Sequence, residues 1–135
     1  MLNFIQSRLR SFGYAFRGFW YVLRTQRNAW IHAVIATIVF ILSFWLQLDA
    51  REWAIIILTT AMVFTAEFLN TAIEAVVDLA SPQKHPLAKV GKDVGAAAVL
   101  IAALAAVLVG LLILGPPFWA RLVPLFTAHE TLIPR

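Results

Sequence analysis

Acidic, amide and hydroxyl side chains recur along one stretch of the chain that is otherwise apolar, and their types could support acid–base or metal chemistry. In the segment TAEFLNTAIEAVVDL they are Glu67, Asn70, Thr71, Glu74 and Asp78. Since an α-helix turns by about 100° per residue, all five fall on one face of a helix. A carboxylate in hydrocarbon is costly, so these groups must meet water, a partner or a binding site.

The expected depth of each carboxylate in a bilayer predicts a different role. If the helix enters the membrane at Trp53, Glu67 lies about 21 Å along it and Glu74 about 31 Å, at a rise of about 1.5 Å per residue. Glu67 is then in apolar surroundings, where a carboxylate can serve as a general base. Glu74 and Asp78 reach the cytoplasmic interface, where a carboxylate suits Mg²⁺, which prefers oxygen donors and keeps several waters.

Basic residues follow in a polar loop that we expect over 80–92. They are Lys84, His85, Lys89 and Lys92. The pair Lys92-Asp93 is expected to open the next helix, and a helix N-terminus beside a lysine is a natural phosphate site. Asp93 has two interpretations of equal weight, as the cap of that helix or as a nucleotide contact.

A base near lipid headgroups, a metal site at the interface and cations for a polyphosphate together indicate phosphoryl transfer from Mg-ATP to a lipid hydroxyl. A small proton-coupled transporter that uses the carboxylates as a proton path stays open as an alternative, although such exporters usually have four spans and one membrane carboxylate. The sequence contains no GxxxxGK[ST] loop and no protein-kinase signature, so the nucleotide site must be of another kind.

The composition predicts that these residues are held by membrane helices. The chain is 61% hydrophobic and 13% charged, against about 45–50% and about 25% in soluble domains. A chain of 135 residues cannot hide that much apolar surface, so we exclude a soluble monomer. The net charge of +4 comes from basic residues beside apolar segments, which favours a membrane surface over nucleic acid. Without cysteine there is no thiolate metal site.

Three apolar segments are long enough to cross a bilayer. The expected spans cover residues 29–48, 53–79 and 94–114. Gly115-Pro116-Pro117 is expected to end the third span. Because three spans enclose little interior and the third carries small residues at a spacing of four, we expect close helix packing and oligomerisation.

The N-terminal segment, residues 2–27, is amphipathic and predicts a helix lying in the membrane interface. The fold class is therefore an all-α membrane protein with a surface helix and three transmembrane helices. We expect one domain over 1–115 and a short extracytoplasmic tail over 116–135. Five arginines precede the first span and three lysines lie in the second loop, so the N-terminus and the 80–92 loop should be cytoplasmic.

The chain resembles the prokaryotic diacylglycerol kinase and undecaprenol kinase family of small trimeric membrane kinases. The resemblance runs from about Phe12 to Leu114 and is carried by EFLNTAIEAVVDL (67–79), HPLAKVGKD (85–93) and AAAVL. The segment RTQRNAWIH (24–32) is similar to the undecaprenol kinase branch. The resemblance implies a homotrimer in the bacterial inner membrane that uses ATP and Mg²⁺. It implies a lipid alcohol as acceptor, with undecaprenol slightly preferred and diacylglycerol as the alternative.

The resemblance also implies roles for single residues. Glu67 matches the family's catalytic base, Asn70 an active-site amide and Glu74 a carboxylate that holds magnesium with the ATP phosphates. Lys92 and Asp93 match nucleotide-contacting positions.

Other matching positions are expected around the nucleotide or the lipid. Lys84 and His85 fall in the ATP-facing loop, and Tyr14 matches an aromatic residue near the nucleotide. Asp78 is expected to support the site. Trp45 is expected to be an interfacial anchor, with a place along the lipid path as the second interpretation.

One position departs from the family pattern. Where the family usually has a second metal-binding glutamate, this chain has Gln26. The Gln26 side chain offers a neutral carbonyl oxygen to the Mg²⁺ that comes with the nucleotide. We therefore expect weak coordination of the metal and retained activity. An inactive structural subunit stays open as an alternative. His32 is expected to be an interfacial or packing histidine.

Overall fold

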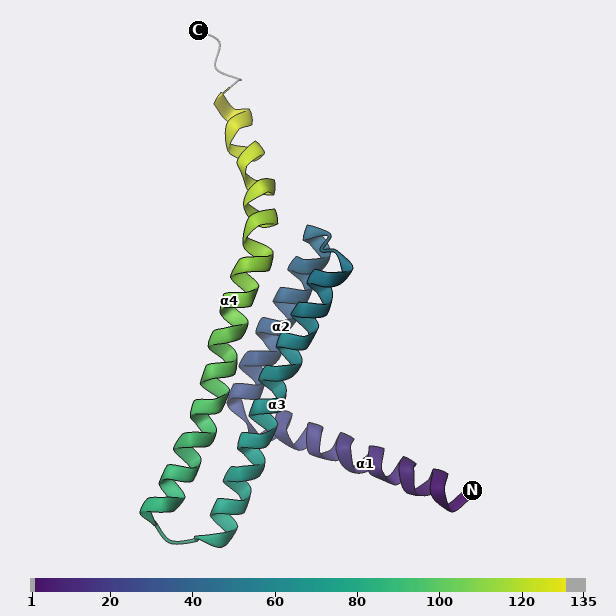
Figure 1. Ribbon diagram of the computed structural model, residues 1–135, viewed down its shortest axis with the longest axis vertical. Helices are drawn as coiled ribbons and strands as arrows, with labels where there is room; N and C mark the ends of the chain where they lie inside the picture. The colour runs from purple at the N-terminus through teal and green to yellow at the C-terminus, as the bar shows by residue number, and fades with distance from the viewer. Residues whose placement is uncertain (1, 131–135) are drawn as a thin grey trace.

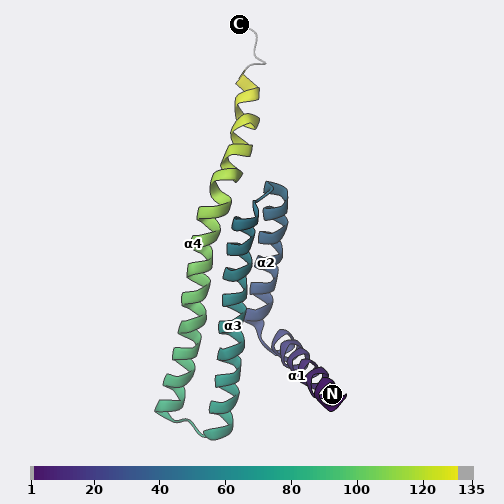
Figure 2. The same cartoon turned by 45° about the vertical axis from the view of Figure 1, so that its right-hand side comes forward.

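The computed structural model describes residues 2–130, with side chains described over 5–124, and every regular element in this part of the chain is an α-helix. The helices are α1 (Leu2–Thr25), α2 (Arg27–Leu46), α3 (Ala50–Ala80) and α4 (Pro86–Glu130). Helices α2, α3 and α4 run side by side, whereas α1 leaves the bundle at a steep angle (Figures 1 and 2). Three helical segments are long and apolar enough to cross a membrane: Arg27–Leu46, Ala50–Ala80 and Pro86–Pro124. The predicted fold class is confirmed.

Helix α1 joins the bundle at the level of the middle of α3 (Figure 1). At this junction the rings of Phe19 and Phe68 meet edge to face, with centroids 5.4 Å apart. The last turns of α3 and the first turns of α4 therefore extend past α1 as a helical hairpin.

The turn between α2 and α3 is shorter than predicted because both helix ends are capped. Gln47 adopts a left-handed conformation (φ 60°) and donates its backbone N–H to Phe44 O at 3.1 Å, which ends α2 at Leu46. Asp49 accepts from the backbone of Glu52, whose carboxylate accepts in turn from Asp49 N at 2.8 Å. This capping box starts α3 at Ala50 rather than at residue 53.

Helix α4 begins at Pro86, so the loop is residues 81–85 rather than 80–92. Proline suits the first helical position because its missing N–H would have no partner there. His85 caps this end, since its Nδ1 accepts from Leu87 N at 3.2 Å. Asp93 lies two turns inside the helix, so its predicted role as the helix cap is wrong.

The far end of α4 also differs from the prediction. Gly115-Pro116-Pro117 does not end the helix, which continues to Glu130; residues 131–135 of the expected tail lie outside the described residues. The fixed φ of proline fits a helix, and Gly115 has no Cβ to clash with the following ring. Trp45 at the end of α2 contacts the extension, with the Arg121 guanidinium 5.0 Å from its ring centroid and Phe118 edge-on at 6.2 Å.

Among the glycines of α4, Gly95 makes the closest approach to α3, and it is buried. A Cβ built there would overlap Asn70 Oδ1. On the same seam, a Cβ at Gly91 would make an ordinary contact of 3.6 Å with Val77 Cγ2. Gly95 therefore lets α4 lie directly against the polar face of α3.

We predict that Gly95→Ala destabilises the protein by about 1–3 kcal/mol, the usual cost of overpacking. Gly91→Ala is the matched control and should be neutral or stabilising by up to about 1 kcal/mol, because alanine favours a helix over glycine. Thermal unfolding of both variants in detergent micelles provides the comparison. Equal melting temperatures would contradict the close approach at Gly95.

Candidate active site

Burial falls steadily along the polar face of α3. Glu67 is 1% exposed and Asn70 8%, whereas Glu74 is half-buried and the Asp78 side chain is 65% exposed. Asn70 Nδ2 donates to Glu74 Oε1 at 3.1 Å, so the amide and the outer carboxylate are held together. The sequence placed these groups on one face, and the structure divides them between two cavities.

The first cavity, which we call the carboxylate cavity, has a volume of about 250 Å³ and lies where α2 begins beside α3 and α4. Its polar lining residues are Gln26, Asn28, His32, Glu67, Asn70 and Glu74. Apolar and small residues of α4 close it on the opposite side. The structure thus brings Gln26, from the start of α2, into one cavity with three of the α3 residues singled out in the sequence.

Two buried oxygen atoms of this cavity have no hydrogen-bond partner among the described residues. They are Glu67 Oε2 and Asn70 Oδ1. The Thr71 hydroxyl, which is also buried, instead donates to the backbone carbonyl of Glu67 at 2.9 Å. Since a buried acceptor without a partner is costly, the two oxygens favour a ligand that brings a donor, such as a hydroxyl group.

His32 is a site residue that sequence reasoning missed. It lines the carboxylate cavity together with Glu67. Asn28, also missed, lies four residues earlier and lines the same cavity. Their spacing on one face of an otherwise apolar helix was the available signal.

The second cavity, which we call the loop cavity, has a volume of about 660 Å³ and lies between the ends of α3 and α4. Its charged and histidine residues are Asp78, Lys84, His85, Lys89, Lys92 and Asp93. Lys92 Nζ lies 2.5 Å from Asp78 Oδ1, so these two predicted site residues form an ion pair across the helical hairpin. The structure thus gathers the predicted nucleotide-contacting residues of this region in one place.

Two predicted site residues line neither cavity. Tyr14 is 63% exposed on α1, where the Arg17 guanidinium lies 4.7 Å from its ring centroid. Trp45 lies 19 residues after Gln26, or about 28 Å along α2 at about 1.5 Å per residue. Within one chain, neither residue reaches the carboxylate cavity.

The oxygen donors of the carboxylate cavity fit a magnesium ion that arrives with phosphates. Gln26 and Glu74 line the same cavity, and Asn70 occupies only one Glu74 oxygen. Within residues 2–130 no group of three or more His, Cys, Asp or Glu residues could hold a metal ion. One carboxylate and one amide suit Mg²⁺, which commonly takes its other ligands from phosphates and water.

Comparison with known proteins gives consistent matches. Residues 13–114 match the family model described as prokaryotic diacylglycerol kinase. The undecaprenol kinase of Bacillus subtilis is 44% identical over 114 residues, which cover 84% of this chain and 93% of that protein. The diacylglycerol kinase of Synechocystis is 46% identical over 85% of this chain and 66% of that protein. The diacylglycerol kinase of Escherichia coli K12 is 33% identical over 82% and 90% of the two chains.

The buried, partly unpartnered carboxylate of Glu67 predicts a stability cost. Glu67→Gln keeps the shape and removes the charge, so we expect unchanged or higher thermal stability. Asp78→Asn at the exposed ion pair is the control, with an expected change of about 1 kcal/mol or less. Thermal unfolding in micelles measures both variants. A clear loss of stability in Glu67→Gln would mean that the buried carboxylate itself stabilises the fold through its charge or its hydrogen bonds.

Proposed function

Since the chain belongs to the prokaryotic diacylglycerol kinase family, we propose that it transfers the γ-phosphate of ATP to the hydroxyl of undecaprenol. The protein is a membrane-embedded lipid kinase, and its family implies ATP as the phosphate donor. The observation that supports a reaction centre at Glu67 is its buried, unpartnered Oε2 in a cavity shared with Glu74. Family membership does not favour the transporter alternative.

The choice of acceptor rests on the named relatives. The Bacillus subtilis relative is an undecaprenol kinase, and the alignment covers nearly all of that protein. Diacylglycerol is the second candidate, since the Synechocystis and Escherichia coli relatives are diacylglycerol kinases.

In this proposal Glu67 acts as the general base. Its Oε2 accepts the proton of the lipid hydroxyl, while the alcohol oxygen forms a bond to the γ-phosphorus and the bond to the bridging oxygen of ADP breaks. Asn70 lines the same cavity as Glu67, and its Nδ2 holds Glu74 in place. The burial of Glu67 keeps bulk water from competing with the alcohol.

Glu74 and Gln26 would hold magnesium in this proposal. Bound magnesium supplies positive charge that offsets the charge on the transferred phosphoryl group. The lysines of the loop cavity, Lys84, Lys89 and Lys92, would contact the nucleotide, together with His85 and Asp93. Tyr14 and Trp45 line neither cavity, so the proposal gives them no substrate contact within one chain.

We also propose a homotrimer in the bacterial inner membrane, with the N-terminus and the loop cavity on the cytoplasmic side. Within one chain, only 17% of the most apolar 18-residue stretch of α2 is buried. The corresponding shares are 28% for α3 and 11% for α4. Such exposed helix faces are available for lipid or for other copies. The lysines around the loop cavity agree with the cytoplasmic placement.

An acceptor assay tests the proposed function. Purified protein in mixed micelles receives ATP labelled in its γ-phosphate, with undecaprenol and diacylglycerol offered side by side. We expect label chiefly in undecaprenyl phosphate, and a loss of about 10²–10⁴-fold in turnover for Glu67→Gln. Label only in phosphatidic acid would select the second acceptor. Label in neither lipid would overturn the kinase assignment.

The neutral ligand at position 26 predicts a changed metal requirement. Gln26→Glu should lower the Mg²⁺ concentration for half-maximal turnover by about tenfold, because it adds a charge to the cavity that already holds Glu74. Glu74→Ala should raise the requirement. The measurement is a magnesium titration of turnover at fixed ATP. An unchanged requirement in Gln26→Glu would show that position 26 does not hold the metal.

A further inference from the structure

The loop cavity and the carboxylate cavity are one helical turn apart on both α3 and α4. On α3, Glu74 lines the carboxylate cavity, and Asp78, one turn further along, lines the loop cavity. On α4, Lys92 lines the loop cavity, and Ala96, again one turn further along, lines the carboxylate cavity. One turn of an α-helix rises by about 5.4 Å. A long side chain at this boundary can therefore extend from one cavity toward the other.

Of the lysines in the loop cavity, Lys92 lies nearest to the carboxylate cavity. Lys84 precedes α4, which begins at Pro86. Lys89 lies two turns before Ala96, or about 11 Å along α4 at about 5.4 Å per turn. Lys92 is one turn from Ala96 and carries its charge on a flexible four-carbon stem. Lys92 is therefore the cation of the loop cavity that is best placed to serve both cavities.

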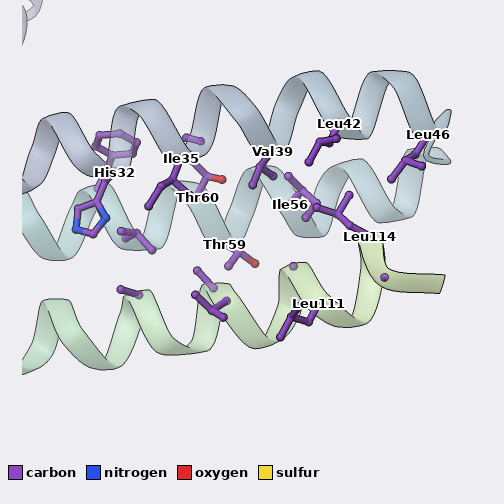
Figure 3. A pocket seen from close by; sticks show the side chains of 18 of the residues that line it. His32, Ile35, Val39, Leu42, Leu46, Ile56, Thr59, Thr60, Leu111 and Leu114 are labelled. Carbon is purple, nitrogen blue, oxygen red and sulfur yellow. The ribbon is translucent and has the colours of Figure 1, made fainter. Parts of the chain in front are cut away.

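The other cavity beside the carboxylate cavity offers a phosphate no lysine or arginine. This cavity is an apolar groove of about 440 Å³ between α2, α3 and α4, and it shares His32 and Ala103 with the carboxylate cavity. Its other polar side chains are those of Thr59 and Thr60, and none of its described lining residues is a lysine or an arginine (Figure 3). The phosphates of a nucleotide therefore find their counter-charges on the loop side.

In the structure, Lys92 is held by a carboxylate that a phosphate can replace. Lys92 Nζ lies 2.5 Å from Asp78 Oδ1, and the two side chains are 37% and 65% exposed. Exposed ion pairs are weak because water screens both charges. A phosphate carries more negative charge and more acceptor oxygens than a carboxylate. A bound nucleotide can therefore take the Lys92 ammonium from Asp78.

We infer that Asp78 is a positioning residue for Lys92. It holds the ammonium in the loop cavity while the site is empty and yields it to the phosphates of the nucleotide. Lys92 then connects the loop cavity to the carboxylate cavity, where Glu74 would hold magnesium. This inference rests on the proposed function and deepens it, because it names the contact that nucleotide binding must break.

Equilibrium binding to Asp78 variants tests the inference. The probe is the magnesium complex of AMP-PNP, a non-hydrolysable analogue of ATP, added to the full-length protein in micelles. Asp78→Asn should lower its Kd by about two- to fivefold, because binding no longer breaks an exposed ion pair. Asp78→Glu is the matched control, since it keeps the charge that holds Lys92, and its Kd should change by less than about 1.5-fold.

A second substitution separates the release of Lys92 from a general effect of charge. Lys92→Met removes the ammonium, so adding Asp78→Asn to it should leave the Kd unchanged. A gain in affinity that persists in the Lys92→Met background would assign the effect to repulsion between Asp78 and the phosphates, and would overturn the inference. An unchanged or higher Kd in Asp78→Asn alone would also overturn it.

Turnover kinetics give a readout that a structural defect would not reproduce. Asp78→Asn should lower the KM for ATP by the same factor and leave the KM for the lipid acceptor unchanged, because the ion pair faces only the nucleotide. A rise in both values would mean that Asp78 serves the fold, and would reject the inference.

The binding measurement also separates this inference from the proposed function, because it does not require turnover. The expected changes in Kd without phosphate transfer to either lipid would retain the role of Asp78 and reject the reaction. Phosphate transfer with a Kd that does not respond to Asp78→Asn would retain the reaction and reject the role of Asp78. Failure of the unsubstituted protein to bind the probe would reject both.

Discussion

The organisation of this protein depends on a carboxylate that hydrocarbon cannot solvate. Glu67 is almost completely buried in a membrane-spanning helix, and one of its oxygens has no partner among the described residues. The helices packed around Glu67 supply polar groups and close contacts at this point. Helix α2 brings His32 and Gln26 to the same cavity, and Gly95 lets α4 approach Asn70 closely. The cost of burying the carboxylate is understandable if a substrate hydroxyl is its missing partner.

The burial gradient along α3 gives similar side chains different chemistry. Glu67 is isolated from water, Glu74 is half-buried and held by Asn70, and Asp78 pairs with Lys92 in the open. The same helix therefore passes from a buried polar cavity to an exposed, charged one. The proposed acceptor and polyphosphate need such neighbouring environments, and the helical hairpin that extends past α1 carries the charged one (Figure 1).

The sequence predicted which segments form membrane-spanning helices, but it predicted the ends of these helices poorly. Apolar segments long enough to span a bilayer identified α2, α3 and α4, because hydrocarbon requires a fully hydrogen-bonded backbone. The ends depended on local capping, such as the Asp49–Glu52 box and the His85 cap before Pro86. At the far end of α4, contacts of Phe118 and Arg121 with Trp45 accompany a helix that continues through two prolines.

The sequence by itself determined the membrane class, the α3 carboxylates and the family resemblance, because these follow from composition, helical periodicity and contiguous motifs. Only the tertiary structure decided which polar residues meet. It joined Gln26, Asn28 and His32 to the α3 carboxylates and left Tyr14 and Trp45 outside. It also placed an apolar groove between α2, α3 and α4 next to the carboxylate cavity, with His32 and Ala103 lining both. Helical spacing fixes the face on which a side chain lies, whereas the partner of that face depends on how separate helices pack.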